Sequence, residues 1–564
     1  MVVSRRIRNN APFVVHKVPN MYRQILDPVA HSLGWSSLVA ALPLAMLFLM
    51  LGVLRVRAWR ASLLSLAVAI AIAVAVYRMP IGQTLLAGGE GAVFGFFPIL
   101  WIVINAIWVY QMTVQTGHFD VLRRSFASVS DDHRIQAIII AFSFGALLEA
   151  LAGFGAPVAV TSVMLLALGF KPLKAAVLAL VANTAPVAYG AMATPIITLG
   201  KVSGLSSEAL GAMVGRQTPI LAIFVPLVLV AIADGRRGVR ETWPAALVAG
   251  VVFGIGQYAT SNFVSVPLAD VVASLLSAGA VVLLLRVQRQ QSAPRATVVA
   301  GGASDTLSPE FAANLGRPDS RIEVARAYSP YAIIIAIFVV CQVPAVKKFL
   351  EHATDTVHWP GLHLYTAKGS PSTLPNFTFN LLTTPGTQML LAGVVAMVVL
   401  RLSVVGAVKA YGATLYQLRW AILTVMAVLA LAFVMNASGQ TITLGAWMAG
   451  AGGAFALLSP ILGWLGVAVT GSDTSSNSLF GALQVTAAAK AGLSPLLMAA
   501  GNSSGGVLGK MISPQNLAIA AAAVDMHGKE GDVFRRVVLW SVVFLVFICA
   551  LSGLQASVLS WMVF

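Results

Sequence analysis

The chain has 564 residues, of which 58% are hydrophobic and only 10% are charged, and its formal net charge is +16. Soluble globular domains carry roughly 25% charged residues, so this composition excludes an ordinary soluble protein. The apolar runs are long and lack the alternation of a membrane β-barrel. The basic residues lie in short loops between these runs, which favours membrane orientation over nucleic-acid binding. We therefore expect an all-α polytopic membrane protein in a lipid bilayer.

Apolar runs of spanning length recur along the chain, since a transmembrane helix needs about 20 mainly apolar residues. They predict about 12 transmembrane helices, over residues 36–54, 61–77, 91–112, 172–200, 207–232, 243–260, 264–285, 329–345, 386–404, 419–436, 493–524 and 537–560. The first run begins near Ser36, so a cleavable signal peptide is not expected. Cys341 and Cys549 fall inside apolar runs without metal-ligand spacing, so no disulfide, metal or cofactor is expected.

Two further segments differ from these runs. Residues 135–170 and 445–490 are each long enough for two passes, but EALAGFGAPV and TGSDTSSN interrupt them with polar, Gly and Pro residues. Polar or irregular backbone at membrane depth is tolerated only when it packs within protein or lines a cavity. We therefore interpret both segments as re-entrant hairpins.

The basic residues also predict an orientation and a division into halves. With two hairpins and the amino terminus outside, most Lys and Arg residues lie in cytoplasmic loops, although the basic tail opposes this orientation. The first hairpin then opens inward and the second outward. The expected parts are an amino-terminal tail (1–35), a first membrane half (36–285), a cytoplasmic linker (286–328) and a second membrane half (329–564). Glu90 and Asp270, near predicted helix ends, are expected at solvated boundaries.

The polar interruptions recur with similar spacing in the two halves. Gly153 precedes Asn183 by 30 residues, and Asp473 precedes Asn502 by 29. Each Asn is followed by a proline 12 residues later, inside the predicted spans 172–200 and 493–524. Each half thus contains a hairpin and then a broken helix, in opposite orientation, which predicts two inverted-topology repeats. Interrupted segments at corresponding positions of two halves indicate the midplane site of a transporter.

Such breaks favour an anionic ligand. A hairpin tip and an unwound helix expose free N–H groups at half-helix amino ends, where the peptide dipoles stabilise negative charge. Ser, Thr and Asn side chains can complete the hydrogen bonds, which predicts a small anionic solute such as a carboxylate. The predicted substrate-binding residues are Gly153, Gly155, Asn183, Thr184, Ser472, Thr474, Ser475, Ser476, Asn477, Asn502, Ser503, Ser504 and Lys510.

Several segments resemble signature stretches of a known family: EALAGFGAPVAVTS, NTAPVAYGAM, VGRQTP, GWLGVAVTGSDTSSNSLFGALQ and SSGGVLGKMISPQNLAIA. They are similar to the bacterial L-lactate permease family, within the wider ion transporter superfamily. The resemblance implies paired hairpins, an elevator-type motion and proton-coupled symport of L-lactate, D-lactate or glycolate across the bacterial inner membrane. A homodimer is compatible with it, because elevator transporters often dimerise around a fixed scaffold.

Three ionisable residues have competing interpretations. An intramembrane carboxylate is a functional hypothesis by default, so Glu149 and Asp473 are the predicted proton-coupling residues. Glu149 could instead cap the N–H groups of the first hairpin tip, and Asp473 could serve as an ordinary helix cap. Lys510 could hold the substrate carboxylate, or it could neutralise Asp473 or Glu149.

Other functions fit the sequence less well. The chain lacks a Walker GxxxxGK[ST] loop, so transport driven by ATP is not supported. An enzyme is not expected, because neither a His-rich metal cluster nor a nucleophile with a base is present. A monocarboxylate or anion channel, or a transporter of another small carboxylate, stays open as the alternative.

Overall fold

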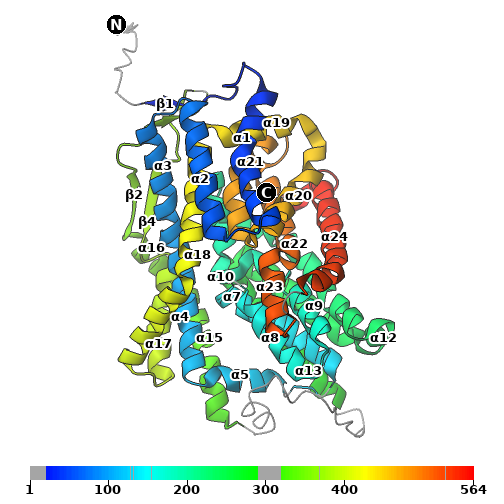
Figure 1. The fold of residues 1–564 in the computed structure, drawn as a ribbon. Coiled ribbons are helices and arrows are strands. Elements are labelled where there is room, and N and C mark those ends of the chain that lie inside the picture. The colour runs from blue at the N-terminus through cyan, green and yellow to red at the C-terminus, as the bar shows by residue number, and fades with distance from the viewer. Residues whose placement is uncertain are drawn as a thin grey trace, which may run out of the picture.

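The computed structural model describes residues 21–127, 129–130, 132–153, 155–289, 319–367, 369–526 and 529–563. Helices dominate these residues, and two short two-stranded sheets lie at one side of the molecule (Figure 1). Most of the predicted amino-terminal tail and of the predicted linker lies outside the described residues. Ten described helices are long and apolar enough to cross a membrane, or eleven when one bent pair is counted as a span.

The first half of the chain contains the elements up to α13. They are β1 (Tyr22–Arg23), α1 (Leu33–Phe48), η1 (Leu49–Val53), α2 (Ala58–Ala75), α3 (Ile81–Phe94), η2 (Gly95–Leu100), α4 (Trp101–Gln115), α5 (His118–Ala127), α6 (His133–Ala137), η3 (Ile138–Phe144), α7 (Gly145–Leu151), α8 (Ala156–Ala167), α9 (Pro172–Ala182), η4 (Val187–Tyr189), α10 (Gly190–Ser203), α11 (Ser207–Val214), α12 (Thr218–Phe263), η5 (Val266–Leu268) and α13 (Ala269–Arg289).

The second half begins with α15. Its elements are α15 (Arg321–Gln342), α16 (Pro344–Glu351), β2 (Thr354–His358), β3 (Leu364–Tyr365), β4 (Asn376–Asn380), α17 (Pro385–Val399), α18 (Val404–Ser438), α19 (Gln440–Met448), η6 (Ala449–Ala454), α20 (Phe455–Thr470), α21 (Asp473–Ala491), α22 (Pro495–Gly509), η7 (Lys510–Ile512), α23 (Pro514–Ala523), α24 (Glu530–Gln555) and η8 (Ser560–Met562). Strands β2 and β4 pair antiparallel, and β1 pairs parallel with β3.

The predicted spans match helices in position, but several boundaries differ, two of them in an informative way. The run predicted at 91–112 belongs to a helical segment, α3–η2–α4, that begins ten residues earlier, at Ile81. The runs predicted at 207–232 and 243–260 share helix α12, which bends at Asp234 and Gly235. In both places polar residues lower the local hydropathy. Helix α3 continues through its polar residues, whereas the backbone of α12 leaves the helical conformation only at Asp234 and Gly235. Hydropathy therefore located the apolar stretches and not the helix ends.

The order of elements recurs in the two halves. A long helical segment, α3–α4 or α18, is followed by a short helix, a helix pair joined by a tight turn, and a broken helix. The helix pairs are α7 with α8 and α20 with α21, and the broken helices are α9 with α10 and α22 with α23. Helices α1 and α2 lie toward one end of the molecule, where α2 packs on α18, while α15 and α17 lie toward the other, where α17 packs on α4 (Figure 1).

Serine and glycine residues set the helix ends around these turns. Ser472, Ser494 and Ser513 cap α21, α22 and α23, each accepting a hydrogen bond from the backbone N–H three residues later. Gly471 ends α20 in the left-handed conformation with φ 75°, which a side chain disfavours. A glycine followed by a serine can thus end one helix and start the next within two residues.

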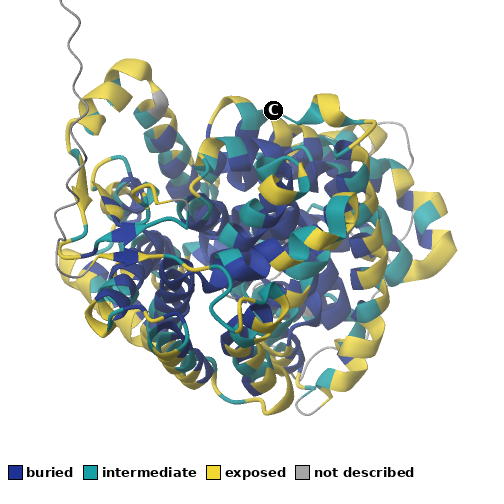
Figure 2. Ribbon diagram, turned by 90° about the horizontal axis from the view of Figure 1, so that it is seen from above, coloured by how far each residue is buried: buried dark blue, intermediate teal, exposed yellow. Residues whose placement is uncertain are grey.

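Burial follows the pattern of a protein that lies in lipid. Buried residues gather at the centre of the molecule and exposed residues at its periphery (Figure 2). Many exposed side chains are large and apolar, such as Val398 and Leu539, which are 68% and 65% exposed. Polar side chains including Asp473, Asn477 and Asn502 are buried instead. The polar site therefore lies inside the helical bundle.

Candidate functional site

The first helix pair turns at two glycines. Helix α7 ends at Leu151 and α8 begins at Ala156, and Gly153 and Gly155 both have positive φ, at 53° and 84°. A Cβ added at Gly155 would also strike the side chain of Ile519 in α23. The glycines predicted in this segment thus permit a tight turn that packs against the broken helix of the other half.

The second helix pair turns where the sequence reads TGSDTSSN. Helix α20 ends at Thr470, and α21 begins at Asp473 after the single turn of Gly471 and Ser472. The backbone carbonyl of Gly471 accepts a hydrogen bond from the Asn516 side chain of α23, at 3.4 Å. Helix α23 therefore touches both turns.

The two broken helices differ in their backbone. Helices α9 and α10 meet at an angle of 65°, and Ala191, Met192 and Ala193 all have positive φ. Helix α22 runs into the short η7 and restarts as α23 behind the cap of Ser513. Lys510 lies in η7, and a Cβ at Gly190 of α10 would approach Oε1 of Glu149 to 2.7 Å. The breaks thus make room for charged side chains.

Glu149 and Lys510 form an ion pair between these elements. Lys510 Nζ donates to Glu149 Oε1 at 2.5 Å, and Asn183 Nδ2 donates to Glu149 Oε2 at 3.0 Å. Both charged side chains are nearly inaccessible to solvent, at 3% for Glu149 and 9% for Lys510. Of the two partners that the sequence left open for Lys510, the structure selects Glu149.

Asp473 has a different environment. Its Oδ2 accepts hydrogen bonds from Ser503 Oγ at 2.6 Å and Asn477 Nδ2 at 3.3 Å. Its Oδ1 is buried, and within the described residues it has no hydrogen-bond partner. Asp473 also caps no helix, because Ser472 is the N-cap of α21. The two buried carboxylates are therefore unequal. Glu149 has a cation at hydrogen-bond distance, whereas Asp473 accepts hydrogen bonds from neutral donors on only one of its two oxygens.

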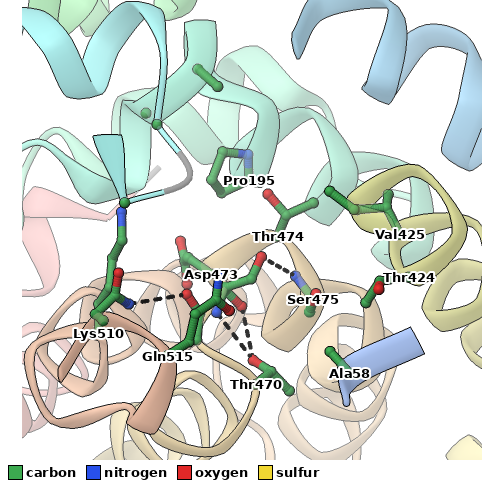
Figure 3. Close-up of a pocket in the computed structure, with 18 of the residues that line it drawn as sticks. Ala58, Pro195, Thr424, Val425, Thr470, Asp473, Thr474, Ser475, Lys510 and Gln515 are labelled. Carbon is green, nitrogen blue, oxygen red and sulfur yellow. Dashed lines mark hydrogen bonds between the residues drawn. The ribbon is translucent and has the colours of Figure 1, made fainter. Parts of the chain in front are cut away.

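A cavity of about 610 Å³ lies between these elements. Eight of the predicted site residues line it: Glu149, Gly153, Gly155, Ser472, Asp473, Thr474, Ser475 and Lys510. In Figure 3, Asp473, Ser475 and Gln515 lie close together, with Lys510 to one side and Ala58, Thr424 and Val425 to the other. Residues of the two turns, the two helix breaks, α2 and α18 thus line one cavity.

The other predicted site residues lie behind the cavity wall. Asn477 donates to the carbonyl of Pro195 at 3.2 Å, and Asn502 donates to Asn477 Oδ1 at 2.8 Å. Ser503 binds Asp473, and Asn183 binds Glu149. The hydroxyls of Thr184, Ser476 and Ser504 donate to Val181, Gly463 and Gln217 respectively. The hydrogen bonds of these side chains are made within the protein and not toward the cavity. Their part in substrate binding therefore stays a prediction.

Comparison with known proteins identifies the family. The model of the L-lactate permease family matches residues 36–559. The chain is 41% identical to the glycolate permease GlcA of Escherichia coli K12, over 94% of this chain and 97% of the relative, and 41% identical to the L-lactate permease of the same strain, over 96% and 100%. The chain belongs to the L-lactate permease family. An L-lactate permease of Bacillus subtilis is 40% identical, over 96% of this chain and 100% of the relative.

This member of the family is therefore a multi-pass membrane protein of a transporter family. Within its described residues, no group of three or more His, Cys, Asp and Glu side chains could hold a metal ion. The family signature segments supply the turns and breaks, as the motifs predicted. Residues outside those motifs also line the cavity.

Sequence reasoning missed several residues of this permease's cavity. Gln515 and Asn516 line it from the first turn of α23, beside Thr194 and Pro195 of α10. Their signal was the Ser-Pro-Gln-Asn sequence that restarts a helix after a break, since proline favours the first helical turn. Arg57, Trp59 and Trp420 line it too. Arg57 and Trp59 lie between the predicted spans 36–54 and 61–77, and Trp420 lies at the start of the predicted span 419–436. Basic residues between spans were interpreted as orientation signals.

The expectation for Glu90 and Asp270 is wrong. Both side chains are fully buried, in the α3–α4 segment and in the first turn of α13. Asp270 Oδ1 accepts from Gln257 at 2.6 Å, and Glu90 lies 3.9 Å from Lys201. The error follows from the helix boundaries, because α3 begins well before the apolar run that was used to place Glu90.

Proposed function

We propose that this chain is a secondary active transporter that moves small 2-hydroxy monocarboxylates together with protons. L-lactate is the first substrate, with D-lactate and glycolate as close analogues, since the relatives are named as L-lactate and glycolate permeases. The cavity of about 610 Å³ falls in the usual range for small-molecule sites. Hydroxyl groups, amide groups and a cation on its wall suit a carboxylate with a neighbouring hydroxyl.

The single observation that carries the proton coupling is the unequal pairing of the two carboxylates. Lys510 compensates Glu149, whereas Asp473 has no cation at hydrogen-bond distance and one oxygen without a partner within the described residues. A substrate carboxylate brought beside an ionised Asp473 would add a second uncompensated negative charge in a buried site, which is costly. A proton on Asp473 removes this repulsion. Anion and proton would therefore enter the site together, with Glu149 as the second coupling residue.

The recurring order of elements supports an elevator-type mechanism with two inverted repeats. In this proposal the pairs α7–α8 and α20–α21 are re-entrant hairpins that move with the broken helices. Helices α2 and α18 contribute the opposite cavity wall and belong to the scaffold. The membrane halves are then residues 36–285 and 329–564, and the bacterial inner membrane is the location. A homodimer built on the scaffold helices fits the same mechanism.

Transport assays in proteoliposomes test this function. We expect saturable counterflow of labelled lactate, competition by D-lactate and glycolate, and accumulation driven by a pH gradient that a protonophore abolishes. Flux that does not saturate and shows no counterflow would favour an anion channel instead. Counterflow with a different class of short acids, and none with lactate, would leave a transporter but change its substrate.

A further inference from the structure

The cavity has an exposed end and a buried end. Glu149, Asp473 and Lys510 lie at the buried end, where 3%, 3% and 7% of the whole residue is exposed. At the other end, Arg57 is exposed and Trp420 is 47% exposed. Arg57 directly precedes α2, and Trp420 is the first residue of α18 that lines the cavity. A solute that enters from this side meets Arg57 and Trp420 before it reaches the hairpin turns.

An aromatic wall forms this entrance. The rings of Trp59 and Trp420 stack, with centroids 5.1 Å apart and an interplanar angle of 17°. The guanidinium of Arg60 lies 5.0 Å from the Trp59 ring, where the ring face attracts the positive charge. The stack joins α2 to α18, so the entrance is built from two packed helices rather than from a loose loop.

Arg57 differs from the other cations near the cavity. Lys510 is engaged with Glu149, and Arg60 lies against Trp59. Within the described residues, the structure gives the Arg57 side chain neither a hydrogen bond nor an ion pair, although Arg57 lines the cavity. Its five N–H donors are therefore available to an incoming anion. A guanidinium matches the two oxygens of a carboxylate in its fork geometry.

We propose that Arg57, with the stacked Trp59 and Trp420 beside it, is an outer binding subsite for the carboxylate of a small monocarboxylate anion at the mouth of the cavity. This inference rests on the proposed function. The subsite concentrates the anion at the entrance through its positive charge. Its affinity is low because the arginine is exposed to water and salt, and low affinity lets the anion move on to the buried end.

Neutralising one arginine at a time in proteoliposomes tests the proposal. Arg57→Gln should raise the half-saturation concentration for lactate exchange about two- to fivefold at about 10 mM salt, the range expected for one exposed ion pair. This difference should shrink at about 150 mM salt, and Arg57→Lys should fall between wild type and Arg57→Gln. Arg55→Gln is the matched control, because Arg55 is an exposed arginine of the short connection before α2 and does not line the cavity. This control should keep the wild-type value.

The other outcomes distinguish the alternatives. Equal effects of Arg57→Gln and Arg55→Gln would assign the effect to general surface charge and overturn the subsite. An unchanged half-saturation concentration with less inserted protein in Arg57→Gln would indicate a contact with lipid phosphate and would also overturn it. Failure of the proposed function itself would look different, because the wild-type protein would then show no lactate exchange at any salt concentration.

Discussion

Lys510 Nζ lies 2.5 Å from Glu149 Oε1, although 361 residues separate the two in the chain. This ion pair joins the first helix pair to the second broken helix, and Asn183 of the first broken helix binds the other carboxylate oxygen. Three of the four interrupted elements therefore meet at Glu149. Removing either charge leaves its partner buried and unpaired.

The first prediction concerns the stability of this pair. Lys510→Met should lower the stability of the purified protein by about 3–5 kcal/mol, because an uncompensated carboxylate remains in the interior. Lys510→Met combined with Glu149→Gln should recover most of this loss, since both charges are then absent. Thermal unfolding in detergent, followed by the loss of monodisperse protein, measures both variants. A double variant that is as unstable as Lys510→Met would show that the cost arises from packing and not from charge.

The second prediction concerns proton coupling. Asp473→Asn should abolish lactate accumulation driven by a pH gradient while keeping exchange of labelled for unlabelled lactate, because exchange does not require release of the proton. Glu149→Gln should also lose accumulation, with an added loss of stability from the unpaired Lys510. Glu208→Gln, at the exposed start of α11, is the control and should behave as wild type. Normal accumulation by Asp473→Asn would remove Asp473 from the coupling mechanism.

The third prediction compares two adjacent serines. Ser475 lines the cavity, whereas Ser476 donates to the Gly463 carbonyl at 3.1 Å and does not line it. A hydrogen bond to a charged group contributes about 1.5–3 kcal/mol, so Ser475→Ala should raise the lactate half-saturation concentration roughly tenfold to a hundredfold. Ser476→Ala should cost about 1 kcal/mol of stability and leave this value unchanged. The reverse pattern would place the substrate on the other side of α21.

The fourth prediction concerns the orientation of the repeats. The test places single cysteines at two exposed positions, Lys171 after the first helix pair and Lys490 in the last turn of the second. The native Cys341 and Cys549 are replaced by serine. If the pairs are inverted hairpins, an impermeant thiol reagent should label Lys171→Cys from the cytoplasmic face and Lys490→Cys from the outer face. Gly155 and Ser475 line one cavity and are therefore less suitable for this assay. Labelling of both lysine positions from one face would contradict the inverted repeat.

The sequence predicted the elements of the site better than the contacts between them. Local hydropathy identifies uninterrupted apolar runs, so the apolar stretches could be located from the sequence, and the polar, Gly and Pro motifs marked the two turns. The partner of Lys510 could not, because Glu149 and Asp473 are equally plausible until the fold brings one of them near. Asn477 and Asn502 were predicted to face the substrate since they are polar, yet they bind each other behind the wall. Polarity at membrane depth shows that a partner is needed, but it does not name the partner.

Ala191, Met192 and Ala193 have left-handed backbone conformations, and this reverses the expected effect of an alanine-to-glycine substitution on stability. In a right-handed helix, replacing alanine by glycine costs about 1 kcal/mol. At Ala191 and Ala193, where φ is 44° and 60°, alanine is the strained residue and glycine relieves a cost of roughly 1–2 kcal/mol per residue. Ala193→Gly should therefore raise the melting temperature or leave it unchanged, while Ala175→Gly in the regular helix α9 should lower it. Screens that treat glycine as uniformly harmful in helices would score this segment with the wrong sign.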